Sequence, residues 1–317
     1  MLADTLVSEF RDEISFYTRC SPKVAQQSAH HVALFLRRQE EDFPHSFTYP
    51  HVMAWLRYLA NTPPRRRSKA KREPSTVNGH LKSLKRFARW AVTRGYLESN
   101  PVESIRGLTE NDRIILAPDA ETVARVLAVA STHGDSDELR ARNRALVCAM
   151  VDIGPRAGEL VKMDAGDLYP DIFTLDRVAV SKGEVPAHVI LHRKRNKDGM
   201  AAVNTLVLLA LMDYLPLRRA RTGVNALWVT ETGERMTYEA IRGVLSRICR
   251  NAGVWVGTHD LRRFCHTVLH ANGIDQVSGM QLGGWSKPET YLKYIRGSVW
   301  TRALNEHRNR SALATLV

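Results

Sequence analysis

The sequence predicts a mainly α-helical protein with one small antiparallel β-sheet, arranged in two domains. Its 317 residues are more than one typical domain needs. Apolar residues recur at three- and four-residue steps along most of the chain, and short β-type runs appear only between residues 173 and 203. We expect an all-helical domain at 1–105, a linker at 106–116, and a mixed domain at 117–317 that ends in a helical tail.

The clearest N-terminal element is a helix that begins at Pro74-Ser75-Thr76, where a hydroxyl can cap the first turn, and ends at Gly95. One face of it is apolar and the other is basic. The apolar positions are Val77, Leu81, Leu84, Ala88 and Ala91. The basic positions are Lys82, Lys85, Arg86 and Arg89. Such a stripe suits a helix laid against phosphates, and it also suits a solvated charged face.

A loop rich in cations precedes that helix. Six of the eight residues from 65 to 72 are basic: Arg65, Arg66, Arg67, Lys69, Lys71 and Arg72. With no apolar anchor among them, they can neutralise several phosphates of a nearby duplex and release its counterions.

The second domain is predicted to begin with a helix at Pro118-Asp119, followed by another from Arg142 to Val151. Two short runs, Arg177–Val180 and His188–His192, then read as strands of a small antiparallel sheet. Helical periodicity returns from Leu206 to the end of the chain.

Composition narrows the function classes. The formal net charge of +13 and the sequence pI of about 9.8 favour a polyanionic partner, such as nucleic acid or an anionic membrane face. The longest apolar run, Leu206–Met212, is far shorter than the ~20 residues that span a bilayer. The N-terminus shows no export signal, so we expect a cytoplasmic protein.

The four cysteines show no CxxC spacing, which argues against a zinc site and a disulfide framework. They are Cys20, Cys148, Cys249 and Cys265. We expect them to be reduced and mostly buried.

Three short segments of the second half carry chemistry. In the first, Gly154-Pro155 breaks the chain and places Arg156 near a helix N-terminus, which is a good location for holding an anion. In the second, His259-Asp-Leu-Arg262, the histidine and the arginine share one helical face. The third, 282–296, offers an indole donor and two phenols. Singly, each of these residues has a structural explanation; together, two arginines, a histidine, an indole and a tyrosine suit metal-free phosphoryl transfer from DNA to a tyrosine.

The order and spacing of these residues resemble the tyrosine recombinase (phage integrase) family, in its Cre- and Xer-like two-domain form. Arg156-Ala-Gly-Glu159-Leu160, His259-Asp-Leu-Arg262 and Leu282-Gly-Gly-Trp285 match three family motifs. The family nucleophile follows the last motif by nine residues, which selects Tyr294 over Tyr291. Tryptophan at 285 is more similar to the Cre branch than to the Xer branch.

The resemblance extends to residues 75–101, which are similar to the last helix of the family's helical, SAM-like core-binding domain. The chain departs from the family in two places. Pro155 stands where the family has an aliphatic residue, and an additional basic loop precedes the helix that begins at Pro74. The arm-binding domain of lambda-type integrases is expected to be absent.

The resemblance implies a role for each residue. Arg156 and Arg262 would hold the non-bridging phosphate oxygens, with Trp285 as a further donor and Glu159 orienting the basic groups. His259 would exchange the proton of Tyr294. A hairpin lysine would protonate the leaving 5′-oxygen; Lys194 fits best, and Lys197 and Lys182 are alternatives. The product would be a 3′-phosphotyrosyl link, and neither a metal nor another cofactor is implied.

The main hypothesis is a site-specific recombinase that acts on double-stranded DNA with a specific target site. It implies a homotetramer on two paired sites, in which the tail from Ser298 to Val317 docks on a neighbouring protomer or on its own domain. A type IB topoisomerase or a telomere resolvase would share the chemistry. A DNA-binding regulator that does not cleave and, more remotely, a basic RNA-binding protein are the non-enzyme alternatives.

Overall fold

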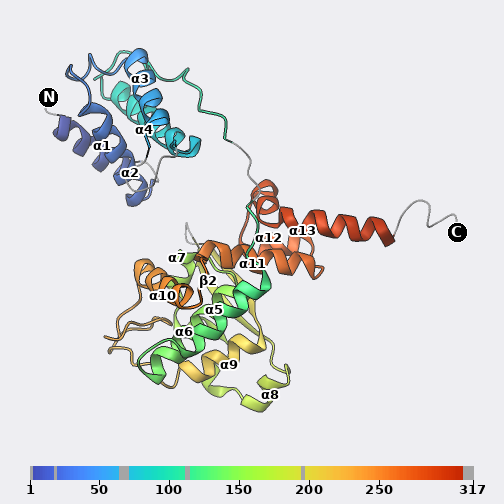
Figure 1. Ribbon diagram of the computed structural model, residues 1–317. Helices are drawn as coiled ribbons and strands as arrows, with labels where there is room; N and C mark the ends of the chain where they lie inside the picture. Colours follow the sequence, from blue (N-terminus) through green and yellow to red (C-terminus); the bar gives the residue numbers. More distant parts are fainter. Residues whose placement is uncertain (1–2, 18–19, 64–70, 111–114, 194–196, 310–317) are drawn as a thin grey trace. The chain divides into compact units, whose positions relative to one another are not determined.

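The chain divides into two units, Met1–Asp112 and Arg113–Val317, and each has its own hydrophobic core (Figure 1). This computed structural model describes residues 3–17, 20–63, 71–110, 115–193 and 197–309. Within those ranges, no helix is both long enough and apolar enough to cross a membrane.

The first unit is helical throughout its described secondary structure. Its helices are α1 (Ala3–Tyr17), α2 (Pro22–Leu36), α3 (Tyr49–Asn61) and α4 (Pro74–Thr93). Helix α2 packs against both α1 and α4. Phe87 of α4 lies at the centre of the core, where Phe10 meets it edge-on at 5.3 Å between ring centroids. Aromatic packing of this kind adds to the area that the core buries.

Helix α4 has the apolar face that its sequence predicts, because all five of the positions named for that face are buried. It begins at Pro74 as predicted, but without the expected hydroxyl cap. The N-cap residue is Glu73, whose side chain makes no capping hydrogen bond, and Pro74 occupies the first turn. Proline favours that position because its missing N–H has no partner there in any case. Gly95, with φ of +74°, follows the C-terminus as expected.

The second unit is mixed, with helices around one small sheet. Its helices are α5 (Ala120–Thr132), α6 (Asp137–Asp152), α7 (Ala157–Lys162), α8 (Arg177–Ser181), α9 (Thr205–Tyr214), α10 (Tyr238–Asn251), α11 (Thr258–Ala271), α12 (Gln276–Gly283) and α13 (Pro288–Asn309). Two 3₁₀ turns, η1 (Ala165–Asp167) and η2 (Ile172–Thr174), flank the first strand. This architecture confirms the predicted fold class.

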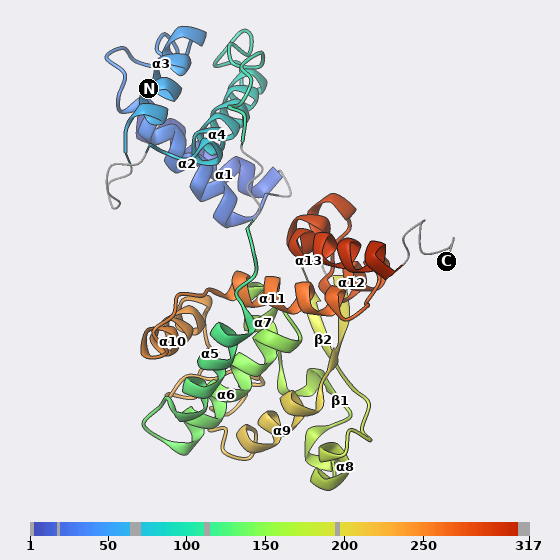
Figure 2. The same ribbon diagram turned by 45° about the vertical axis from the view of Figure 1, so that its right-hand side comes forward.

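The sheet has the order β1-β2-β3 and is antiparallel. Its strands are β1 (Leu168–Tyr169), β2 (Ala187–Arg193) and β3 (Lys197–Val203). In the β2–β3 hairpin Arg193 pairs with Lys197 and Leu191 pairs with Gly199. Figure 2 shows this hairpin beside α12, which contacts β3, while α7 contacts β2. The hairpin therefore brings residues near 193 to the helices that carry the chemical motifs.

Two sequence predictions in this unit were wrong in detail. Residues 177–180 form helix α8 and no strand, because the Asp176 carboxylate accepts a hydrogen bond from Val178 N and caps a helical turn. Helix α6 begins at Asp137, five residues before the predicted start, because the Ser136 hydroxyl caps it through Leu139 N. In both cases a local polar cap outweighed the apolar pattern.

The cysteines have no disulfide partner in the described chain. Cys249 and Cys265 are buried, whereas Cys20 and Cys148 are half-buried, so the expectation of mostly buried thiols is only half met.

Candidate active site

The site is built from three chain breaks that bring distant segments together. Gly154 adopts φ of +59°, which lets the chain turn between α6 and α7, and Arg156 becomes the N-cap residue of α7. Helix α11 begins at Thr258 and carries the His259 motif in its first turns. Gly284, with φ of +64°, ends α12 just before Trp285. Glycine is required at both turns because a side chain disfavours a left-handed backbone.

Arg156 is held from two sides. One terminal nitrogen of its guanidinium donates to Glu159 Oε1 at 2.7 Å, and the other donates to Gly284 O at 2.8 Å. The second oxygen of Glu159 accepts the backbone N–H of Arg156 at 2.8 Å, which ties the start of α7 to its first turn. Glu159 is itself only 4% exposed. The carboxylate therefore fixes both the backbone and the side chain of this arginine.

Arg262 is buried, with 2% of its surface exposed. Its two terminal nitrogens donate to Gly154 O at 2.5 Å and to Gly283 O at 2.6 Å. Burial lowers the pKa of the guanidinium to about 10, and the charge of Arg156 acts in the same direction. The group thus stays protonated at neutral pH. A guanidinium has five N–H donors, so each arginine keeps donors for an anion after its two protein bonds.

Tyr294 meets His259 directly. The phenolic oxygen lies 3.2 Å from His259 Nδ1. Burial lowers the pKa of His259, and Arg262 and Arg263 lower it further. A histidine with such a pKa is neutral at pH 7, so its ring nitrogen can accept the phenolic proton. The guanidinium carbon of Arg262 lies 5.9 Å from the centroid of the Tyr294 ring.

Trp285 lies at the centre of this cluster. Its ring is 4.1 Å from the guanidinium carbon of Arg262 and 4.8 Å from the Tyr294 ring. A Cβ on Gly283 would come within 1.8 Å of the indole, so only glycine at 283 lets the ring fold back onto α12. Tyr291 is fully buried beside Trp285, as expected of a packing residue.

The structure therefore brings six of the predicted site residues into one place: Arg156, Glu159, His259, Arg262, Trp285 and Tyr294. The candidate lysines differ. Lys194 lies outside the described residues. Lys197, which was predicted as a hairpin lysine in the turn itself, is the first residue of β3. Lys182 caps the C-terminus of α8 and is exposed there.

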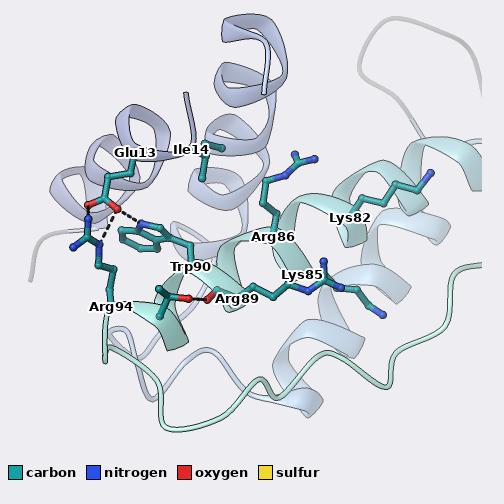
Figure 3. Close-up of a pocket in the computed structure, with 9 residues that line it drawn as sticks. Glu13, Ile14, Lys82, Lys85, Arg86, Arg89, Trp90 and Arg94 are labelled. Carbon is teal, nitrogen blue, oxygen red and sulfur yellow. Dashed lines mark hydrogen bonds and ion pairs between the residues drawn. The ribbon is translucent and has the colours of Figure 1, made fainter. Parts of the chain in front are cut away.

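The basic stripe of α4 lines a groove of about 810 Å³ against α1 in the first unit (Figure 3). Lys82 and Arg89 are exposed, while Lys85 and Arg86 are half-buried. Arg89 pairs with the Glu103 carboxylate at 2.9 Å, and Lys85 donates to Glu103 O at 2.6 Å. Part of the predicted positive charge is thus compensated within the protein.

The loop before α4 is described only in part. Arg65, Arg66, Arg67 and Lys69 lie outside the described residues. Lys71 is exposed, as a DNA contact requires. Arg72 is half-buried, and its charge helps to lower the pKa of His80 in α4.

Three residues near the site were missed by the sequence analysis. Arg193 donates to the end of α12, His266 packs edge-on against Trp285 at 4.5 Å, and Arg263 lies 5.3 Å from the Tyr294 ring. His266 is 1% exposed, and burial lowers its pKa to about 3, so it is neutral. For two of them the sequence offered a signal. Arg263 is adjacent to Arg262 in α11, and His266 lies four residues, about one helical turn, after it. Arg193 carried no such signal, because the carbonyl that it bonds, Leu282 O, lies 89 positions away.

Throughout the described ranges, no group of three or more His, Cys, Asp or Glu side chains is arranged to hold a metal ion.

The comparisons with known proteins agree with this geometry. The model of the phage integrase family matches residues 119–299. A stretch of 172 residues is 27% identical to the tyrosine recombinase XerC of Neisseria meningitidis serogroup B, over 54% of this chain and 52% of that protein. Another of 235 residues is 25% identical to XerC of Lactobacillus delbrueckii subsp. bulgaricus, over 71% of this chain and 73% of that protein. The chain thus spans about half the length of the Neisseria relative. These relatives carry Xer names, whereas Trp285, with Tyr294-Ile-Arg behind it, favoured the Cre branch.

Solved structures share the fold at low sequence identity. The XerH site-specific recombinase bound to its palindromic difH substrate has a TM-score of 0.70 at 14% identity, over 95% of this chain and 84% of that chain. The integrase of the Tn1549 transposon, in complex with transposon right end DNA, has a TM-score of 0.68 at 14% identity, over 98% and 100%. Since the family model covers more than half of the 317 residues and the motif residues meet in one site, the chain belongs to the phage integrase family.

Proposed function

We propose that the protein is a site-specific DNA recombinase, which cleaves and rejoins DNA through a 3′-phosphotyrosyl intermediate and exchanges strands between two sites. The observation that carries this proposal is the contact between the Tyr294 hydroxyl and His259 Nδ1, beside the two anchored arginines. A nucleophile, a base and anion-binding groups are the parts that transesterification at phosphorus needs.

In the first step the Tyr294 oxygen attacks the scissile phosphorus. A free phenol has a pKa near ~10, so at neutral pH it is a weak nucleophile until a base removes its proton. His259 supplies that base, since its lowered pKa keeps the ring neutral.

The charge that grows on the non-bridging oxygens is met by Arg156 and Arg262. Both guanidiniums are oriented before DNA arrives, because backbone carbonyls of the protein hold them. Pre-oriented donors stabilise a transition state without reorganising during the reaction. Trp285 stacks on Arg262 and keeps its plane in place, and the indole N–H is a further candidate donor.

The bond to the 5′-oxygen breaks as the bond to Tyr294 forms, so the leaving oxygen needs a proton. Lys194 is the proposed donor. Its neighbour Arg193, the last described residue of β2, contacts the end of α12, which supports a location for the hairpin beside the site. The phosphotyrosyl ester conserves the bond energy, so a 5′-hydroxyl of the partner strand can reverse the step.

A duplex bound to the groove of α4 is the proposed partner of the first unit. Strand exchange needs two duplexes and four protomers; the lambda integrase, a fold neighbour with a TM-score of 0.65 at 14% identity, is known as a tetramer bound to a Holliday junction. We assign the end of α13 to assembly, since Leu304 is 52% exposed there. Deleting residues 304–317 should preserve binding to one site and impair pairing of two sites; unchanged tetramerisation would contradict this assignment.

The central test begins with selection of the cognate DNA site from random duplexes. Wild type should form a covalent adduct on a nicked duplex that carries this site, and Tyr294→Phe should form none. Tyr291→Phe is the matched control and should retain the adduct, because that ring only packs. An adduct in Tyr294→Phe would assign the nucleophile elsewhere. No adduct with wild type would favour a regulator that does not cleave.

The role of Lys194 has its own test, in a duplex whose scissile 5′-oxygen is replaced by sulfur. A thiolate leaves without protonation, because its conjugate acid is far stronger than an alcohol. Lys194→Ala should cleave the oxygen substrate at least 100-fold more slowly than wild type and the sulfur substrate at nearly the wild-type rate. Lys197→Ala and Lys182→Ala are the matched controls. If either control cleaved only the oxygen substrate slowly, that lysine would be the proton donor instead of Lys194.

A topoisomerase with the same chemistry would relax supercoiled plasmid that lacks the selected site and would leave paired sites unexchanged. Recombinant products from two cognate sites separate the two activities.

A further inference from the structure

A third arginine, Arg193, belongs to the architecture of the active site. It is the last described residue of β2, and only 15% of its side chain is exposed. One terminal nitrogen of its guanidinium donates to Leu282 O at 2.9 Å and approaches Gln281 O at 3.5 Å. Arg193 thus bridges the hairpin and the C-terminus of α12.

Three consecutive carbonyls at the end of α12 each hold one arginine. The pairs are Leu282 O with Arg193, Gly283 O with Arg262, and Gly284 O with Arg156. The last carbonyls of a helix lack partners within the helix and carry the negative end of its dipole, so cations are favoured there. The three carbonyls belong to consecutive residues, so a shift of the backbone at Leu282 also moves the carbonyls of Gly283 and Gly284.

Arg193 is also linked to Arg156 through a shared carboxylate. Glu159 Oε1 lies 3.8 Å from Arg193 Nε and 2.7 Å from a terminal nitrogen of Arg156. Burial lowers the pKa of Arg193, and the carboxylate of Glu159 opposes that shift. The Arg193 charge is therefore supported inside the site and is not a solvated surface charge.

The chain keeps a space open for this guanidinium. A Cβ on Gly199, in β3, would lie 2.2 Å from the Arg193 guanidinium carbon. A Cβ on Gly284 would lie 2.6 Å from the same atom. Arg193 therefore passes between two residues that have no side chain, one on each side.

We propose that Arg193 is a positioning residue, which holds Leu282 O and with it the turn of residues 282–284, so that Arg156 and Arg262 are aimed at the scissile phosphate. This inference rests on the proposed function. Arg193 acts through that turn and through Glu159, and it does not itself touch the phosphate.

The test compares the rate of adduct formation at saturating protein with the affinity for the selected duplex. Arg193→Met should slow adduct formation at least tenfold and change the Kd less than twofold, and Arg193→Lys should recover part of the rate. Arg177→Met is the matched control, since Arg177 forms an ion pair with Asp213 in the same unit. It should react at the wild-type rate.

Gly199→Ala gives an independent measurement. Its methyl group displaces the flexible end of Arg193 and leaves the β3 backbone in place, so this variant should be slowed as much as Arg193→Met. In an Arg193→Ala background the same methyl group meets no guanidinium, and Gly199→Ala should cause no further loss. An equal loss in both backgrounds would contradict the proposal.

A neutral methylphosphonate at the scissile position separates positioning from general damage. This substrate lacks one non-bridging oxygen charge and depends less on aimed arginines, so the deficit of Arg193→Met should shrink on it. The same deficit on both substrates, or a wild-type rate on the ordinary phosphate, would overturn the inference. If the wild-type protein formed no adduct, the proposed function itself would be wrong, and Arg193 would have no cleavage reaction to serve.

Discussion

The arginines of the two units differ in how they are held. In the groove of the first unit, Arg86 donates to the Ser28 hydroxyl, and Arg89 pairs with Glu103 while more than half exposed. In the second unit, Arg262 is buried and both of its terminal nitrogens bond to backbone carbonyls. The comparison teaches that one residue type is held in two ways: side chains hold the arginines that we propose as counterion replacements along DNA, whereas backbone carbonyls orient the buried arginine that we propose as a transition-state donor.

The first prediction, which has the largest expected effect, compares the same substitution in both units. Arg262→Lys removes the planar fork, so one of the carbonyls of Gly154 and Gly283 loses its donor and the remaining donors lose their direction. Since removal of a single transition-state donor costs about 100- to 1,000-fold, we expect adduct formation to slow by about 1,000-fold. Arg86→Lys should react within about twofold of wild type. The measurement is the single-turnover rate on the nicked duplex.

Equal losses in these two variants would break the comparison. An unfolded Arg262→Lys protein would be recognised by circular dichroism, and its affinity for the selected site should stay near that of wild type if the fold is intact.

The second prediction concerns a buried histidine with no part in the proposed chemistry. In the first unit His80 stacks on His31 at 3.8 Å, and burial, His31 and Arg72 lower its pKa to about 3. The unfolded chain, with a histidine pKa near 6.5, binds the proton first, so stability is lost as the pH falls below that value. At pH 5 the loss reaches about 2 kcal/mol.

His80→Phe should therefore narrow the difference in unfolding free energy between pH 7.5 and pH 5. The measurement is urea denaturation at the two pH values, with adduct formation as the control, which should not change at neutral pH. An unchanged pH dependence would mean that His80 is charged in the folded protein.

Sequence patterns could predict much of the fold, but little of how the arginines of the two units are held. The apolar periodicity of α4 and the chain break at Gly154-Pro155 are local, so they could be read directly. The nine-residue spacing from Trp285 selected Tyr294, and the two rings lie 4.8 Å apart. The helix starts capped by Asp176 and Ser136 were missed, because each depends on a single capping hydrogen bond.

The anchoring of the site could not be predicted, because its partners are backbone carbonyls far along the chain. Arg193 and Leu282 are 89 positions apart, and a carbonyl has no side-chain identity that a sequence could reveal. In the same way, the pairing of Arg89 with Glu103 is invisible in a pattern of basic residues alone.

The third prediction sharpens the comparison within the groove. Lys82 is exposed, whereas the charge of Arg89 is compensated by Glu103. A residue that neutralises one phosphate contributes about 0.9 to the slope of log K against log salt concentration. Lys82→Gln should lower that slope by about 0.9, and Arg89→Gln should lower it by less.

Affinity for the selected duplex, measured at several salt concentrations, gives both slopes, and the adduct rate at saturation should stay unchanged. Equal slopes for the two variants would show that the ion pair with Glu103 opens when DNA binds.

The last prediction has the smallest effect and tests whether Arg263, a half-buried cation beside the anchored arginines, acts only through the pKa of His259. Arg263 lies beside Tyr294, pairs with Asp260 at 3.1 Å, and contributes to the lowered pKa of His259. In Arg263→Gln the cation is lost and Asp260 loses its partner, and both changes raise the pKa of His259. Protonated His259 cannot accept the phenolic proton, so the acid side of the rate profile should move to higher pH, by about half a unit. At pH 8, where the ring is neutral in both proteins, the rates should agree within about twofold. A uniform loss at every pH would mean that Arg263 acts on the phosphate directly and belongs with the anchored arginines.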